Sequence, residues 1–260
     1  MNHIKVVRDG PVTQVELNRP EVLNAITAEM HDELQAAFDD FAVDPEQRVC
    51  IITGAGDRAF CAGTDVKAAV AAGPGVSAYP RSGYAGLTER FDCNKPFIAA
   101  VNGLALGGGF EIVLACDIVI ASEDASFGLP EPLIGAIALA GGLHRLAQRL
   151  PINLAMGMIL TSRAMSARDA LQHGLVNELV APDELMAAAR RWGDDILRAS
   201  PVATQMSKAI VRRGLAEPDL ETALRNQSGY PEFTEWKTSQ DFHEGIQAFA
   251  ERRAPRWSGR

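Results

Sequence analysis

The stretch Asn102-Gly-Leu-Ala-Leu-Gly-Gly-Gly-Phe-Glu-Ile-Val-Leu-Ala-Cys-Asp117 decides what fold and chemistry the sequence predicts. From Pro96 to Cys116 the only charged side chain is Glu111. A carboxylate in such an apolar run has to be paired, protonated or used in chemistry, because burying a bare charge costs several kcal/mol. The structural alternative is a first-turn glutamate that complements the helix dipole, which contributes roughly 0.3–1 kcal/mol. That alternative explains a position near a helix start, but not the apolar residues around it.

Three glycines, Gly107, Gly108 and Gly109, precede this glutamate. Glycines at a helix start let backbone N–H groups point outward and let a ligand come very close. Helix N-termini bind anions and developing oxyanions. The alternative is close packing of the helix on the preceding strand, which glycines also allow. The triple glycine beside a buried acid favours a binding or catalytic site.

A second glutamate, Glu131, stands between two prolines in Leu129-Pro130-Glu131-Pro132. The prolines fix the backbone on both sides and help to aim the side chain. The alternative is a solvated carboxylate on a loop. Two carboxylates that differ in burial can have separate pKa values, so that one acts as an acid while the other acts as a base.

Composition limits the classes of function that remain. The chain has 260 residues, of which 47% are hydrophobic and 22% charged, as in ordinary globular proteins. The net charge of -8 argues against a surface for nucleic acid or anionic membrane, because both require clustered Lys and Arg. No signal peptide or membrane span is predicted. Cys50, Cys61, Cys93 and Cys116 form no C-x-x-C pair, so we expect reduced thiols and a cytoplasmic location.

Hydrophobic spacing predicts strands alternating with helices to about residue 180, and only helices after Pro182. Asp9-Gly10-Pro11 predicts the turn of a β-hairpin, and Thr27 is the expected N-cap of a helix over 28–42. Residues 68–87 are predicted to be a mobile loop over a site or a poorly structured insert. The remaining predicted strands are 49–53, 96–101, 118–121 and 176–180, and the remaining helices are 107–116, one from Ser166 to Gly174, 183–198, 201–213, 219–228 and 239–252.

The residues give little support to two other kinds of site, a dinucleotide-binding site and a site with histidine ligands. Gly54-Ala-Gly56-Asp-Arg-Ala59 fits a dinucleotide-binding fingerprint, but residues 70–85 contain no Asp or Glu to bind a ribose. The five histidines are scattered, and only His144 is of interest because it closely follows Gly141-Gly142.

The stretch 102–117 resembles the signature of the enoyl-CoA hydratase/isomerase (crotonase) superfamily. Phe60-Cys-Ala-Gly-Thr-Asp65 resembles the family's other oxyanion loop, and Asn18-Arg-Pro-Glu-Val-Leu-Asn-Ala25 its CoA-contacting segment. Glu244-Gly245 with Ala248-Phe249-Ala-Glu-Arg-Arg253 resembles its C-terminal helix. The resemblance covers nearly the whole chain in the same order. It implies an α/β fold, a crotonase-like spiral of ββα units over 1–195 that holds the active site, and a helical trimerisation or lid region over 196–260.

The presence of both acids resembles the hydratase branch of the family, and implies reversible addition of water to a trans-2-enoyl-CoA. Carried over by position, the backbone N–H groups of Thr64 and Gly108 would bind the thioester oxygen. Glu131 would be the main proton donor to C2, and Glu111 would position and deprotonate the water.

The resemblance also implies the binding partners. Coenzyme A would enter as part of the substrate, with no metal and no separate cofactor, and the chain would form a homotrimer or a hexamer made of two trimers. Lys67 is the side chain expected to reach a phosphate. The residues expected to contact CoA are Val22, Ala25, Ala62, Asp65, Val66, Lys67 and Phe249.

The chain departs from the family pattern near the acyl site. Ala138 stands where a proline is common, and Leu129 where a glutamine is frequent. These departures keep two enzymatic alternatives open: a carnitinyl-CoA-type dehydratase and an enoyl-CoA isomerase acting on a specialised acyl group. A third alternative is a non-catalytic acyl-CoA-binding or RNA-associated member. Both acids and, for RNA, the acidic net charge argue against it.

Overall fold

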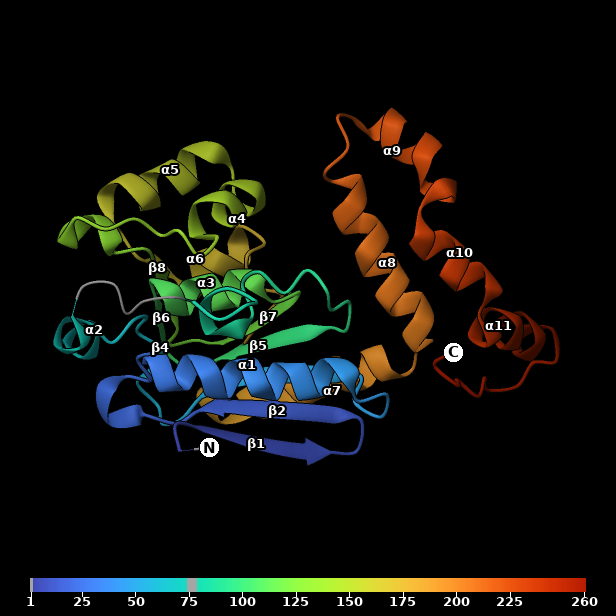
Figure 1. The fold of residues 1–260 in the computed structure, drawn as a ribbon, viewed down its shortest axis with the longest axis horizontal. Coiled ribbons are helices and arrows are strands. Elements are labelled where there is room, and N and C mark those ends of the chain that lie inside the picture. Colours follow the sequence, from blue (N-terminus) through green and yellow to red (C-terminus); the bar gives the residue numbers. More distant parts are fainter. Residues whose placement is uncertain (1, 74–78) are drawn as a thin grey trace. The chain divides into compact units, whose positions relative to one another are not determined.

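The computed structural model describes residues 2–73 and 79–260. The chain forms two compact units. The first contains the residues up to 91 together with 97–193, and the second contains 92–96 and 194–260. Figure 1 labels most of the helices and strands of the chain.

A six-stranded sheet in the order β1-β2-β3-β5-β7-β10 organises the first unit. β1 and β2 form an antiparallel hairpin with Asp9 opposite Val12, as the sequence predicts, and every further pairing is parallel. Thr27 accepts a hydrogen bond from the Met30 N–H and so caps α1, which confirms the predicted helix start. The bounds are β1 Ile4–Asp9, β2 Val12–Leu17, α1 Ala28–Val43, β3 Val49–Gly54, β5 Phe97–Val101, β7 Ile118–Ser122 and β10 Glu178–Val180.

A second, smaller sheet has the order β4-β6-β8-β9. Its strands have only two or three residues each, which is too short to show a period of two in the sequence, so none of them is predicted. The bounds are β4 Ala59–Cys61, β6 Leu104–Leu106, β8 Ser126–Gly128 and β9 Met165–Ser166.

The two sheets are linked by repeated ββα units. A strand of the large sheet is followed by a strand of the small sheet and then by a helix, in the series β3-β4-α2, β5-β6-α3 and β7-β8-α4. The helices are α2 Val66–Ala72, α3 Gly108–Ala115 and α4 Gly142–Arg149. This arrangement confirms the predicted α/β spiral, and it brings the starts of α2 and α3 to corresponding ends of neighbouring strands.

The prediction of a loop over 68–87 is wrong for residues 68–72 and 84–86, which are helical. Residues 68–72 belong to α2, where Asp65 caps the helix by accepting from the Ala68 N–H and alanines favour helix. Residues 82–88 are buried and include a short 3-10 helix, η2 Tyr84–Gly86. A Cβ added to Gly86 would lie 2.6 Å from the Gln35 Cα, so this glycine allows close packing on α1. Residues 74–78 of the predicted loop lie outside the described residues.

Of the other α-helices that the structure describes wholly within the first unit, one was predicted and two were not. α6 Ala167–Gln172 starts at Ser166, whose hydroxyl accepts from the Asp169 N–H as predicted. The helices α4 and α5 Ile152–Thr161 were not predicted. All four cysteines are buried. Short 3-10 helices are η1 Pro20–Val22, η3 Glu131–Ile134 and η4 Pro182–Glu184.

Beyond Pro182 the chain is helical, as predicted, and α7 Leu185–Leu197 runs across the boundary between the units. Within the second unit, buried Asp241 accepts hydrogen bonds from the Ser200 hydroxyl and the Ser258 N–H, which ties the start of α8 to the C-terminal residues. The trimerisation or lid role of 196–260 stays a prediction. The bounds are α8 Pro201–Gly214, α9 Leu220–Asn226, η5 Gln227–Gly229, α10 Pro231–Thr238 and α11 Gln240–Ala250, of which α10 was not predicted. None of the helices in the described part of the chain has both the length and the apolar character that crossing a membrane requires.

Candidate active site

The glycine turn (Gly107–Gly109) positions the start of α3 in the structure. Gly107 has φ +54° and ψ −127°, a backbone conformation that only glycine adopts readily. A Cβ on Gly109 would collide with the Cys61 carbonyl oxygen, so Gly109 allows α3 to pack directly on β4. Close packing of the helix on the preceding strand therefore explains Gly109, whereas Gly107 lies beside the Glu131 carboxylate.

Glu111 is buried, with 3% of its surface exposed. Its Oε1 accepts a hydrogen bond of 2.8 Å from the N–H of Gly142, the first residue of α4. Burial raises the pKa of the Glu111 carboxyl to about 7, although backbone hydrogen bonds from Gly142 and Ala140 act in the opposite direction. The carboxylate thus contacts the start of a different helix, so complementing the dipole of its own helix does not explain its position.

Glu131 begins η3, where its carboxylate approaches the glycine turn from the side of β8. A Cβ built on Gly107 would lie 3.0 Å from Glu131 Oε1. Glu131 Oε2 is buried and has no hydrogen-bond partner among the described residues. Burial raises the pKa of this carboxyl as well. Glu131 is therefore not a solvated loop carboxylate, and its charge raises the pKa of Glu111.

The second oxyanion loop predicted from the sequence lies against the glycine turn. A parallel bridge joins Thr64 to Ile26, with the Ile26 N–H donating to Gly63 O at 2.8 Å and the Asp65 N–H donating to Ile26 O at 2.9 Å. In a parallel bridge the N–H of the middle residue, Thr64, points away from the partner strand.

This loop also comes close to Gly108. A Cβ on Gly63 would lie 3.1 Å from the Gly108 nitrogen. Gly108 is the first residue of α3, so its N–H has no acceptor within the helix. The structure therefore places the Thr64 loop beside the start of α3.

Six of the seven residues expected to contact CoA lie on two adjoining segments. The Ala62 N–H donates to Leu23 O at 3.0 Å, and the Arg19 guanidinium bridges Asp65 at 3.0 Å and Ala25 O at 2.6 Å. Val22 in η1 and Val66 and Lys67 in the first turn of α2 are exposed. Phe249 belongs to α11 in the second unit, where 88% of its side chain is exposed.

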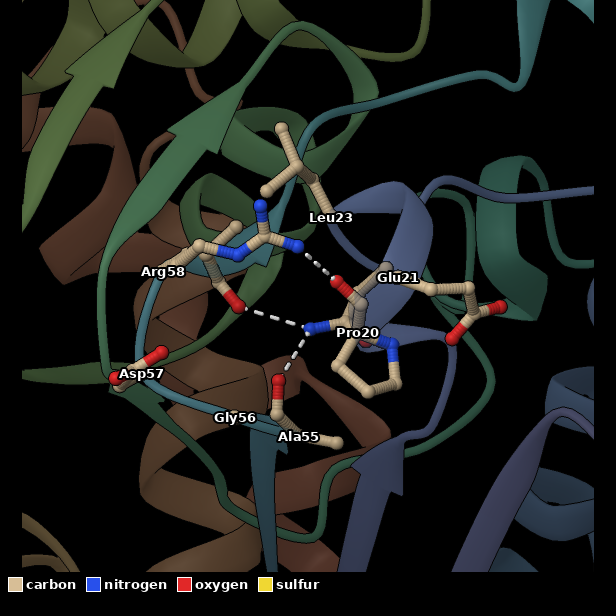
Figure 2. Close-up of a pocket in the computed structure, with 9 residues that line it drawn as sticks. Pro20, Glu21, Leu23, Ala55, Gly56, Asp57 and Arg58 are labelled. Atoms are coloured by element: carbon tan, nitrogen blue, oxygen red, sulfur yellow. Dashed lines mark hydrogen bonds between the residues drawn. The ribbon is translucent and has the colours of Figure 1, made fainter.

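A small pocket adjoins the first of these segments (Figure 2). The Arg58 guanidinium donates to Pro20 O at 2.7 Å, and the Asn24 side-chain amide donates to Ala55 O and Ala59 O. Neither Glu111 nor Glu131 lines this pocket. Its lining consists of Pro20, Glu21, Leu23, Asn24, Ala55, Gly56, Asp57, Arg58 and Ala59.

An aromatic cluster that was not predicted, made of His31, Tyr79 and Tyr84, lies beside the acids. The ring centroids of His31 and Tyr84 are 4.6 Å apart, and those of Tyr79 and Tyr84 are 5.5 Å apart. Burial and the charges of Glu111 and Glu131 raise the pKa of Tyr79. Two tyrosines in a segment of otherwise small residues were the available signal. His144 is exposed on α4.

Comparisons with known proteins agree with this arrangement. The sequence model of the enoyl-CoA hydratase/isomerase family matches residues 8–260. An enoyl-CoA hydratase structure from Mycobacterium tuberculosis superposes with a TM-score of 0.91 at 37% identity, covering 100% of both chains. An enoyl-CoA hydratase structure from Bacillus anthracis gives 0.89 at 33% identity, again over 100% of both chains. The chain therefore belongs to the enoyl-CoA hydratase/isomerase family.

Among curated relatives, a carnitinyl-CoA dehydratase from Salmonella typhi is 43% identical over 99% of this chain and 98% of the relative. One from Proteus mirabilis is 44% identical over 96% of each. The family and these names make the chain an enzyme of the hydro-lyase type.

Proposed function

We propose that this chain catalyses the reversible addition of water to a trans-2-enoyl-CoA thioester. Glu111 and Glu131 form the acid–base pair, and the backbone N–H groups of Thr64 and Gly108 bind the thioester oxygen. The observation that carries the proposal is that the buried carboxylate of Glu111 and the half-buried carboxylate of Glu131 come from different elements to the start of α3 at Gly107–Gly108.

The oxyanion donors account for activation of the substrate. Hydrogen bonds from the Thr64 and Gly108 N–H groups withdraw electron density from the thioester carbonyl and so make C3 electrophilic. When the oxygen of water bonds to C3, the C2=C3 electron pair moves toward the carbonyl, and the negative charge collects on the thioester oxygen. Donors fixed by the backbone stabilise that charge without reorganising.

The two glutamates account for the protons. Glu111 holds the water and takes one of its protons as the C3–O bond forms. Glu131 then gives a proton to C2, which turns the enolate back into a thioester and leaves a 3-hydroxyacyl-CoA. In the reverse direction Glu131 removes the C2 proton and Glu111 protonates the leaving hydroxyl.

Burial allows both carboxyls to exchange protons near neutral pH. The pKa of Glu111 is about 7, and the pKa of Glu131 is also raised. Because the charge of Glu131 also raises the pKa of Glu111, ionised Glu131 favours the protonated form of Glu111.

The test is to replace each acid by its amide. Glu111→Gln and Glu131→Gln each keep the shape of the side chain but remove its proton transfer, and each should lower kcat for crotonyl-CoA hydration about 100- to 10,000-fold. Hydration is followed by the loss of the enoyl thioester absorbance. Glu123→Gln, at an exposed carboxylate, is the matched control and should keep wild-type kcat. If Glu111→Gln or Glu131→Gln kept the wild-type rate, the assignment of these residues as the acid–base pair would be wrong.

A second candidate is dehydration of a carnitinyl-CoA, which the names of the relatives at 42–44% identity favour. The chemistry at C2 and C3 is the same, so the acyl group is the only difference. A panel of short, branched, aromatic and carnitine-derived enoyl-CoAs separates the candidates by kcat/KM. Bond migration without water addition in that panel would instead identify an isomerase.

We further propose that the CoA moiety lies along 22–25 and 62–67, with the exposed Lys67 ammonium near a phosphate. The adjoining position of these two segments supports this placement. We also propose that the chain forms a trimer or a hexamer. Light scattering of the purified chain tests this directly.

A further inference from the structure

The Tyr84 turn (residues 82–88) carries a buried phenol next to both proposed oxyanion donors. Tyr84 is 1% exposed, and its hydroxyl lies 3.2 Å from the Thr64 hydroxyl, so either group can donate to the other. A Cβ added to Gly108 would lie 2.5 Å from the Tyr84 hydroxyl oxygen. The phenol therefore contacts one donor residue through its hydroxyl and the other through its ring edge.

This turn is fixed from two sides. On the α1 side, the Ala85 N–H donates to His31 Nδ1 at 2.9 Å, and the Ser82 N–H donates to the Gln35 side-chain oxygen at 3.0 Å. On the α4 side, Arg145 donates to Thr88 O at 2.6 Å. Since α4 also supplies the hydrogen bond to Glu111, the turn and the acid share one support.

The backbone of the turn is held in an uncommon conformation. Ala85 has φ +54°, a left-handed conformation that is unfavourable for a residue with a Cβ. Strain of this kind persists when surrounding contacts determine the geometry, and it tends to occur at functional sites. Here the surrounding contacts place the phenol between Thr64 and Gly108.

We propose that Tyr84 is a positioning residue for the oxyanion site. Its hydroxyl holds the Thr64 side chain, its ring sets the position of the Gly108 backbone, and the two N–H donors thereby keep a fixed separation. The inference rests on the proposed function, because it assumes that these two N–H groups bind the thioester oxygen. Burial keeps the pKa of Tyr84 well above that of a free phenol, so its hydroxyl stays protonated across the working range.

The test separates the hydroxyl from the ring. Tyr84→Phe keeps the ring that packs on Gly108 and removes the hydrogen bond to Thr64. We expect kcat for enoyl-CoA hydration to fall about tenfold with KM changed less than about twofold, because the hydroxyl positions N–H donors whose stabilising effect is on charge that develops only in the transition state. Tyr230→Phe is the matched control, since Tyr230 is also a buried tyrosine, whose hydroxyl donates to Glu217 at 2.7 Å in the second unit. Its kcat should equal that of the wild type.

A spectroscopic readout reports the oxyanion site directly. Butanoyl-CoA labelled with ¹³C at the carbonyl cannot be hydrated, and its C=O stretch moves to lower frequency when the oxygen accepts strong hydrogen bonds. The wild-type chain should produce this shift, and Tyr84→Phe should produce a smaller one. A merely structural role for the phenol would lower stability without changing the bound carbonyl.

Thr64→Ala removes the same hydrogen bond from its other side. It leaves the buried Tyr84 ring unchanged, because the Thr64 side chain is exposed. If the two hydroxyls act through one hydrogen bond, the double variant loses no more kcat than the more affected single variant. Additive losses in that cycle overturn the inference, as does a Tyr84→Phe enzyme with wild-type kcat and wild-type carbonyl shift. Failure of the proposed function is distinct from both, because the wild type itself would then show neither hydration nor a carbonyl shift.

Discussion

The glycine turn and the Tyr84 turn meet at one point, but only the first can be recognised in the sequence. In the glycine turn, the backbone freedom, the buried acid and the helix start all lie within five consecutive residues, Gly107 to Glu111. The Tyr84 turn gains its meaning from α1, α4 and Thr64, which are distant in the chain. Local signals in the sequence therefore identify the proposed reacting groups, whereas the groups proposed to position them depend on long-range contacts.

The largest effect is expected where the two turns touch. Gly108→Ala places a methyl group into the Tyr84 ring, so either the ring or the start of α3 has to move. Displacing one oxyanion donor costs roughly 100- to 1,000-fold, and we expect kcat to fall by at least about 100-fold. Steady-state hydration kinetics measure the loss.

The control for this change is Gly157→Ala in α5, an exposed helical glycine at which an added Cβ meets no atom within 4 Å. It should keep wild-type kcat. A Gly108→Ala enzyme as active as Gly157→Ala would show that the contact with Tyr84 has no bearing on the reaction.

Burial of the Glu111 carboxyl makes the stability of the folded chain depend on pH. The pKa of Glu111 is about 7 in the folded chain and near the ordinary 4.5 when unfolded, so the folded state binds more protons between these values. Stability therefore falls as pH rises from about 4.5 to 7. Glu111→Gln removes this term and should stabilise the protein at pH 8 by on the order of 3 kcal/mol, with little gain at pH 4.5.

Urea unfolding at several pH values measures this difference, with exposed Glu123→Gln as the reference variant. Equal stability of Glu111→Gln and wild type at pH 8 would contradict the burial cost assigned to Glu111.

The smallest effect is expected on the Tyr84 turn itself. His31→Leu removes the acceptor of the buried Ala85 N–H, and the loss should lower the free energy of unfolding by about 1–3 kcal/mol. Burial lowers the pKa of His31 to about 4, so the ring is neutral and able to accept throughout the neutral range. His144→Leu, at an exposed helical histidine, should change stability by less than about 0.5 kcal/mol. Equal destabilisation of the two variants would show that the hydrogen bond from Ala85 does not fix the turn.

Part of the fold could be predicted because the deciding residues are neighbours in the chain. Asp9-Gly10 makes a hairpin turn, and Thr27 and Ser166 cap helices through bonds that reach only three residues ahead. The second sheet could not be predicted, because strands of two or three residues show no periodicity and exist only through their pairing. Residues 79–87 were misjudged for a related reason: small residues and glycines indicate a loop unless a neighbouring helix is known to require them for close packing.

The sequence by itself determined the lone acid Glu111, the glycine turn before it and the family pattern that connects them to Thr64 and Glu131. Each of these depends on residue type and order, which the chain carries directly. Only the tertiary structure decided that Glu131 Oε2 is buried without a partner among the described residues, that Gly142 donates to Glu111, and that Tyr84 contacts both Thr64 and Gly108. Burial and hydrogen bonding depend on segments that meet only when the chain folds, and these same quantities set the pKa values and the geometry of the site.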